Sequence, residues 1–181
     1  MSSVTDLSKF LFERYINKNS VAVDATCGNG NDTLHLASKS KFVYAFDIQK
    51  EALKSAKNLT KEFNNIKFIN DGHENLDKFI KENVDLIVFN LGYLPGKNKD
   101  ITTKYETTLK ALKISLKLIK PEKAIIMTVY PGHEEGKRES LFLKEYLKTL
   151  DYKKFDIFIH ELFNKPNNPP FIYEIVKKRF L

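Results

Sequence analysis

The sequence predicts an α/β fold with a seven-stranded, mostly parallel sheet, helices on both faces and an antiparallel hairpin at the C-terminal end. Two observations lead to this prediction. Five short apolar runs alternate with segments of helical periodicity, and strands that alternate with helices form a parallel sheet through right-handed crossovers. The last two apolar runs are joined by a loop without an intervening helix, which indicates a closing antiparallel pair.

The helical periodicity begins near the N-terminus. Leu7, Phe10, Leu11 and Ile16 are apolar at helical spacing, which predicts a covering helix over residues 5–16, within an N-terminal segment of residues 1–18. The later helices are predicted over residues 32–38, 51–63, 76–81, 104–119 and 137–149. The short apolar runs predict strands over residues 21–25, 42–48, 66–70, 84–90, 123–130, 154–162 and 171–178.

Length and composition favour a single domain over residues 1–181, because no repeat, low-complexity tract or linker indicates a second one. No apolar run approaches the ~20 residues that span a bilayer, and the N-terminal segment is too charged for a secretory signal. The single cysteine, Cys27, excludes an internal disulfide and is consistent with a cytoplasmic protein. The formal charge of +7 is compatible with a polyanionic partner but leaves nucleic-acid binding open, because the lysines are scattered among acids.

A glycine-bearing turn, DATCGNGND, directly follows the first predicted strand. Gly28 and Gly30 lack a Cβ atom, so the backbone there can take positive φ and a ligand can approach closely. Thr26 replaces the first glycine of the nicotinamide G-x-G-x-x-G motif, and an acid at a strand end that leads into G-x-G fits S-adenosylmethionine (SAM) better. A tight turn without a ligand is the alternative. The turn residues predicted to bind SAM are Asp24, Ala25, Thr26, Gly28, Asn29, Gly30, Asn31 and Asp32.

Acids also follow the second and third predicted strands. Asp47 lies 17 positions beyond Gly30, near the spacing at which a carboxylate accepts hydrogen bonds from a ribose diol, and Gln49 lies beside it. The run Asp71-Gly72-His73 lies where such folds contact the adenine. The alternatives are that Asp47 caps the next helix and that His73 is an ordinary hydrogen-bonded loop residue.

The fourth predicted strand ends in Asn90, which is predicted to border the cofactor as well as the substrate. Asn90-x-x-Tyr93 has the spacing of the Asn/Asp-Pro-Pro-Tyr/Phe motif of methyltransferases that act on amino groups. The Asn90 side-chain oxygen would accept amine hydrogens and stabilise the charge that grows on nitrogen, while Tyr93 would stack on a base or close the pocket. Leu91-Gly92 replaces Pro-Pro, so the match is partial. The segment from Asn168 to Phe171 spells the motif better, but it precedes the last strand and is interpreted as a rigid loop beside the substrate pocket.

A glycine-bracketed loop follows the fifth predicted strand and carries His133, Lys137 and Arg138. These side chains could bind a phosphate or receive a proton, and a solvated, charged helix start is the alternative. No second histidine lies at ligand spacing from His133, so no metal site is predicted.

These strings together, with FDIQ, DGHE, FNLGYLPG, PGHEEGKRE and KPNNPPF, resemble the rRNA methylase family of class I SAM-dependent methyltransferases, typified by tRNA 5-(aminomethyl)-2-thiouridine methyltransferase. The resemblance covers nearly the whole chain. It implies that SAM methylates the aminomethyl group on wobble uridine 34, with S-adenosyl-L-homocysteine (SAH) as the second product. It also implies that His133, Lys137 and Arg138 meet the anticodon stem-loop of a tRNA. Asn168, in the loop beside the substrate pocket, is predicted to bind the substrate as well.

Other functions stay open on the sequence alone. They are methylation of rRNA or of a small amine, a non-catalytic RNA-binding module with a retained SAM fold, and a nicotinamide-dependent oxidoreductase. The sequence does not determine the tRNA species, the general base or the oligomeric state, and a homodimer is compatible with it.

Overall fold

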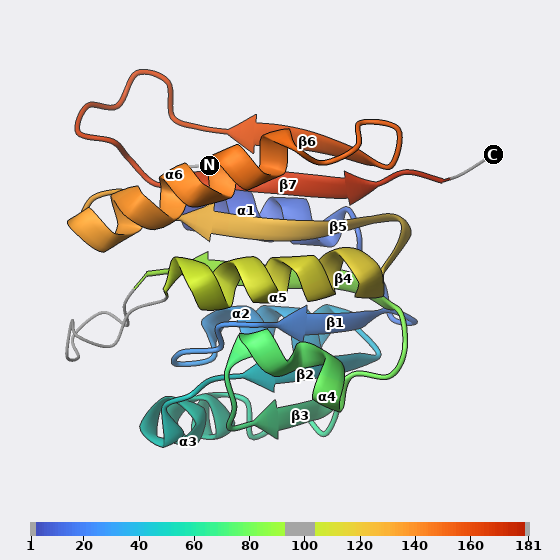
Figure 1. Cartoon of the computed structure of the whole chain (residues 1–181). Coiled ribbons are helices and arrows are strands. Elements are labelled where there is room, and N and C mark those ends of the chain that lie inside the picture. The colour runs from blue at the N-terminus through green and yellow to red at the C-terminus, as the bar shows by residue number, and fades with distance from the viewer. Residues whose placement is uncertain (1–2, 93–103, 180–181) are drawn as a thin grey trace.

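The computed structural model describes residues 3–92 and 104–179 and contains one seven-stranded sheet with strand order β3-β2-β1-β4-β5-β7-β6 (Figure 1). The strands are β1 (Val21–Asp24), β2 (Phe42–Phe46), β3 (Ile66–Ile69), β4 (Val84–Leu91), β5 (Ile119–Val129), β6 (Phe155–His160) and β7 (Phe171–Lys177). The helices are α1 (Val4–Glu13), α2 (Asn31–Lys39), α3 (Lys50–Leu59), η1 (His73–Asn75), α4 (Leu76–Phe79), α5 (Tyr105–Leu118) and α6 (Glu134–Lys148). The predicted fold is therefore confirmed.

The strands β3, β2, β1, β4 and β5 pair in parallel, while β7 pairs antiparallel with both β5 and β6. The chain leaves β1 first toward β2 and β3 and later returns to β4 on the other side of β1. A crevice forms at such a switch point, outside the carboxyl ends of the strands, and ligands of open α/β sheets bind there.

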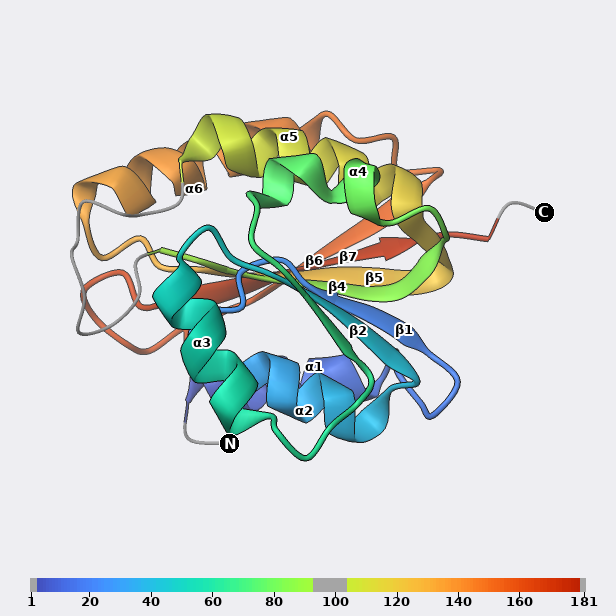
Figure 2. The same ribbon diagram turned by 90° about the horizontal axis from the view of Figure 1, so that it is seen from below.

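Helices cover both faces of the sheet: α1, α2 and α3 lie on one side and α4, α5 and α6 on the other (Figure 2). The nearly continuous apolar sequence of β4 explains this arrangement, because Ile87 and Phe89 join the core beneath α5 while Leu86 and Val88 join the core beneath α1 and α2. In the described parts of the chain, no helix has the length and apolar character needed to cross a membrane.

Two predicted boundaries differ in an informative way. The strand β5 begins at Ile119, four residues before the predicted start. It contains Pro121 and Glu122, which has φ 62°, and its register against β4 shifts before regular pairing resumes at Ala124. A proline that cannot donate to the ladder therefore lies at an irregular strand start. The helix α6 begins at Glu134, three residues before the predicted start, because His133 caps it.

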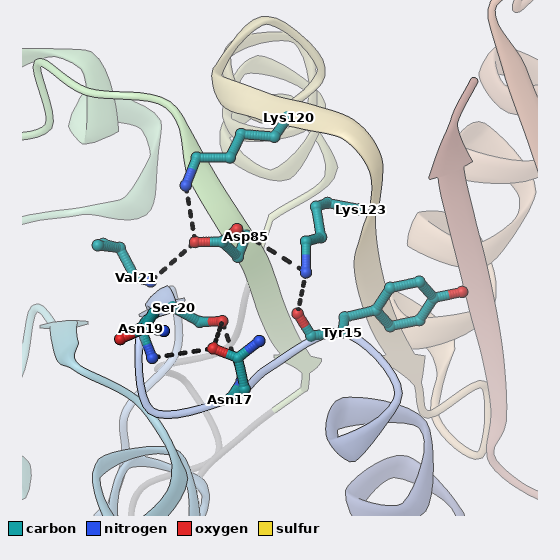
Figure 3. A network of polar contacts seen from close by, with 8 residues as sticks. All are labelled: Tyr15, Asn17, Asn19, Ser20, Val21, Asp85, Lys120 and Lys123. Carbon is teal, nitrogen blue, oxygen red and sulfur yellow. Dashed lines mark hydrogen bonds and ion pairs between the residues drawn. The ribbon is translucent and has the colours of Figure 1, made fainter. Parts of the chain in front are cut away.

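A buried polar network holds the amino ends of three strands together (Figure 3). Asp85, only 6% exposed, accepts hydrogen bonds from the Val21 backbone N–H at 2.9 Å and from Lys120 Nζ at 2.8 Å. Lys123 Nζ lies 3.8 Å from the same carboxylate and donates to the Tyr15 carbonyl at 2.7 Å. The network thus joins β1, β4 and β5 to the segment after α1. It lies at the amino ends of these strands, opposite the carboxyl ends.

Candidate active site

A cleft of about 1170 Å³ lies at the carboxyl ends of the parallel strands. It gathers twelve of the residues predicted to bind the cofactor, namely Ala25, Thr26, Gly28, Asn29, Asn31, Asp32, Asp47, Gln49, Asp71, Gly72, His73 and Asn90. His133 and Asn168, both predicted to bind substrate, also line it. Tyr93 lies outside the described residues.

The two predicted cofactor residues that do not line the cleft, Asp24 and Gly30, stabilise the conformation of the glycine-bearing turn. Asp24 is fully buried and accepts hydrogen bonds from Thr33 Oγ1 at 2.6 Å and from the Thr26 backbone N–H at 3.3 Å. Burial, with a further contribution from the negative charge of Asp32, raises the pKa of Asp24 to about 7. The side chain of Asp24 therefore shapes the turn and has no surface available to a ligand.

Gly30 is the other supporting residue. Its φ of 90° lies in the left-handed region, and a Cβ atom there would lie 2.7 Å from Ala56 Cβ on α3. Glycine is required at this position both for the turn and for the close approach of α2 to α3. Its N–H closes the turn by donating to the Cys27 carbonyl at 2.9 Å.

Asp47 binds the turn from the end of β2. One carboxylate oxygen accepts from the Gly28 backbone N–H and the other from the Gln49 backbone N–H, both at 2.8 Å. Gln49 is the N-cap residue of α3, so Asp47 lies two residues before the cap. A carboxylate offers about four acceptor positions, which leaves lone pairs on Asp47 for hydroxyl groups in the cleft.

Hydrogen bonds from residues within the segment after β3 fix its conformation. Asp71 Oδ1 accepts from the Gly72 backbone N–H at 2.7 Å and from Asn75 Nδ2 at 2.8 Å. His73 is 9% exposed and packs edge-on against Phe89, with ring centroids 5.8 Å apart. Burial lowers the pKa of His73, against an opposing attraction to Glu74, so the neutral ring is favoured.

Asn90 is held on two sides at the end of β4. Its backbone N–H donates to Thr26 Oγ1 at 2.6 Å, and its side-chain Nδ2 donates to Asp32 Oδ2 at 2.5 Å. Burial raises the pKa of Asp32, while the hydrogen bond from Asn90 lowers it. An ionised carboxylate can only accept hydrogen bonds, so the amide NH₂ faces Asp32 and Oδ1 is turned away from it.

Tyr130 is a cleft residue that the sequence analysis missed. It follows β5, and Gly92 lies against its ring. Burial and the charge of Asp32 both raise the pKa of Tyr130, so its hydroxyl keeps its proton at neutral pH. Its position at the carboxyl end of the strand next to β4 was the signal that could have identified it.

His133 has a structural role that was not predicted. Its Nδ1 accepts a hydrogen bond from the Gly136 backbone N–H at 3.0 Å and caps α6. The acceptor nitrogen of a neutral imidazole carries no proton, so the ring proton resides on Nε2.

The structure separates the three basic residues that were predicted to act together. Lys137 lines a neighbouring hollow, which it shares with Asn168. Arg138 lines neither space, because its guanidinium lies 5.2 Å from the centroid of the Tyr105 ring and 6.0 Å from that of Phe142. His133 therefore lines the cleft, Lys137 lines the neighbouring hollow and Arg138 packs on two aromatic rings.

Known proteins resemble both the sequence and this geometry. The family described as "Putative rRNA methylase" matches residues 43–176. The chain belongs to the rRNA methylase family. A chloroplastic tRNA (mnm(5)s(2)U34)-methyltransferase of Arabidopsis thaliana is 35% identical over an alignment 185 residues long. The alignment covers 93% of this chain and 68% of the relative.

Two solved structures extend the resemblance to nearly the whole fold. A "putative rRNA-methylase" from Clostridium thermocellum matches with a TM-score of 0.94 at 35% identity and covers 98% of each chain. A "putative methyltransferase" from Streptococcus mutans, in complex with SAH, matches with a TM-score of 0.91 at 34% identity over 98% of this chain and 99% of the other. This rRNA methylase family member is a SAM-dependent methyltransferase, as the sequence predicted.

Three features of the cleft in this methyltransferase fit SAM. Asp47 retains acceptor positions for a diol. His73 Nε2 is buried without a hydrogen-bond partner among the described residues. The helix α2 starts beside the cleft after Gly30, which supplies no side-chain cap, so its first N–H groups suit an anion. Within residues 3–92 and 104–179, no three His, Cys, Asp or Glu side chains cluster as a metal site.

Proposed function

We propose that the protein methylates the primary amine of 5-aminomethyl-2-thiouridine at tRNA position 34, which yields 5-methylaminomethyl-2-thiouridine and SAH. Two findings support this proposal. The first is the 35% identity to a relative named for that wobble uridine. The second, which carries the chemistry, is the fixed amide of Asn90 in the cleft.

The amide of Asn90 would orient the amine. Because Nδ2 is engaged by Asp32, Oδ1 is the atom that remains to accept a hydrogen from the substrate nitrogen. Such a bond aims the nitrogen lone pair and stabilises the positive charge that develops on nitrogen during the transfer. Asp32 is then a positioning residue, which acts on the reaction through Asn90.

Different residues of the cleft would bind different parts of SAM. Bound SAM supplies an electrophilic methyl group on a sulfonium, which an amine nitrogen attacks directly. Asp47 would accept from the ribose diol, and the segment from Asp71 to His73 would border the adenine. The N–H groups at the start of α2 would face the carboxylate of the amino-acid end.

The proton that leaves the amine needs an acceptor, and the geometry argues against His133. Its Nδ1 lone pair is already used for the Gly136 N–H, and its Nε2 carries the ring proton. To act as a base, His133 would have to release the cap of α6. We therefore assign the proton to water, with the Tyr130 phenol as a neutral hydrogen-bonding group at the cleft wall.

The test is incubation with labelled SAM and tRNA that lacks the final methyl group, followed by nucleoside analysis. We expect the label in 5-methylaminomethyl-2-thiouridine. Asn90→Ala should keep SAM affinity, measured by calorimetry, and lose turnover by about 100-fold, the scale typical of removing one oriented transition-state hydrogen bond. Asp47→Ala should show the reverse pattern. No label at position 34 of the tRNA, or equal loss of SAM affinity in both variants, would contradict the proposal.

A further inference from the structure

A second hollow, of about 580 Å³, adjoins the cofactor cleft and has no part in the proposed methyl transfer. It lies between α6 and the loop that joins β6 to β7, and Asn168 and Pro169 line both spaces. The two spaces therefore share part of one wall and lie next to each other. We call the second hollow the lysine groove, defined by Lys137, Leu141, Lys144, Phe163 and Lys165.

The charge of the lysine groove favours an anionic occupant. Lys137 and Lys144 reach it from α6, and Lys165 from the loop, against the single acid Glu161. In the part of the chain that the structure describes, none of these three lysines forms an ion pair with a carboxylate. Their ammonium groups are thus available to phosphate oxygens without breaking an internal ion pair.

An aromatic ring stands beside these charges. Phe163 is 94% exposed, the highest value among the large apolar side chains of the described chain, and Leu141 next to it is 59% exposed. An exposed phenyl ring in a hollow that is also lined by lysines is unfavourable in water but suits a nucleobase, because bases stack on aromatic side chains without regard to sequence. A bare phosphate or an acidic peptide would use the lysines and leave the ring uncovered.

The loop that carries Phe163 has a defined backbone. Asn167 and Asn168 adopt φ values of 64° and 47°, and prolines stand on both sides of this pair. Asparagine tolerates the left-handed region better than most residues, and proline restricts φ. The loop therefore holds the groove wall next to the cleft.

We propose that the lysine groove binds unpaired RNA nucleotides next to the target nucleotide, with a base stacked on Phe163 and the backbone phosphates on the lysines. This proposal rests on the proposed action on tRNA. A wobble nucleotide that is turned into the cleft leaves its neighbours in the loop unpaired, and the adjoining groove offers both the stacking surface and the positive charge that unpaired nucleotides need.

The chain offers a matched pair of variants. Phe163→Ala/Lys165→Ala removes one aromatic ring and one lysine from the groove, while Tyr152→Ala/Lys153→Ala removes the same two kinds of exposed side chain at the other end of β6. The probe is a fluorescent anticodon stem-loop RNA, titrated by anisotropy at several salt concentrations. SAM affinity, measured by calorimetry, should be unchanged in both variants.

We expect the groove variant to bind the RNA at least about tenfold more weakly, since stacking of one base contributes roughly 1–3 kcal/mol. Its slope of log affinity against log salt should fall by about 0.7 for each phosphate that is no longer neutralised by a lysine. RNA affinity equal to that of the Tyr152 and Lys153 control would overturn the groove proposal, even if tRNA is methylated. Weaker RNA binding by the groove variant, without methylation at position 34, would uphold the groove and refute the wobble-uridine assignment.

Discussion

Gly30→Ala tests whether the cofactor turn and the packing of α2 on α3 depend on the same missing Cβ atom. The alanine would adopt φ 90°, which costs an L-residue roughly 1–2 kcal/mol, and its methyl group would lie 2.7 Å from Ala56 Cβ. Overpacking of this kind costs about 1–3 kcal/mol, and the lower entropy of the unfolded chain returns less than about 1 kcal/mol. We therefore expect a loss of about 3 kcal/mol, or a Tm lower by roughly 6–12 °C.

Urea unfolding followed by circular dichroism measures this loss, and Gly132→Ala is the stability control. An added Cβ at Gly132 would meet no atom within 4 Å, so its effect should stay within about 0.5 kcal/mol. Because the turn lies in the cofactor cleft, Gly30→Ala should also weaken SAM binding. A Gly30→Ala protein within 1 kcal/mol of the unmodified chain (about a third of the expected loss) would refute the reasoning.

Two further predictions concern buried carboxylates. Burial raises the pKa of Asp24 to about 7, whereas the same group in the unfolded chain loses its proton near pH 4. Between these two pH values the folded protein binds one proton more than the unfolded chain, so the free energy of unfolding falls as the pH rises from about 4 to about 7. Asp24→Asn should therefore gain stability relative to the unmodified chain between pH 4 and 7, by up to about 4 kcal/mol in urea titrations, and a pH-independent difference would refute this. Asp85→Ala leaves the Val21 N–H and two lysines without their shared acceptor and should cost about 3 kcal/mol, whereas Lys120→Ala should cost at most about 1 kcal/mol because Lys120 is partly exposed. Equal losses in these two variants, by the same urea assay, would contradict the role of Asp85.

The parallel strands could be predicted because burial on both faces makes each of them a nearly continuous apolar run, as in β4. The start of β5 could not be predicted. A proline and charged residues separate Ile119 from Ala124, so the first residues of the strand show no apolar pattern. The start of α6 was missed for another reason. Histidine is not among the preferred N-cap residues, so His133 gave no capping signal.

The part of the site that lies at the ends of the parallel strands could be predicted from the sequence. Residues at the ends of β1, β2, β3 and β4 meet in one cleft, as the rule for parallel sheets requires. The bond between Asp32 and Asn90 spans 58 positions and cannot be read from local spacing. The separation of Lys137 from Arg138 follows from the helical geometry of α6, which points adjacent side chains in different directions.

The place of β7 in the sheet has a consequence for synthesis on the ribosome. β7 lies between β5 and β6, although both precede it in the chain. Until residues 171–177 emerge, the nascent polypeptide must leave the long β5 strand with one unpaired side, a template for wrong pairing with another chain. Completion of the sheet therefore waits for residues 171–177 to be translated, and a product that stops before them should be prone to aggregation.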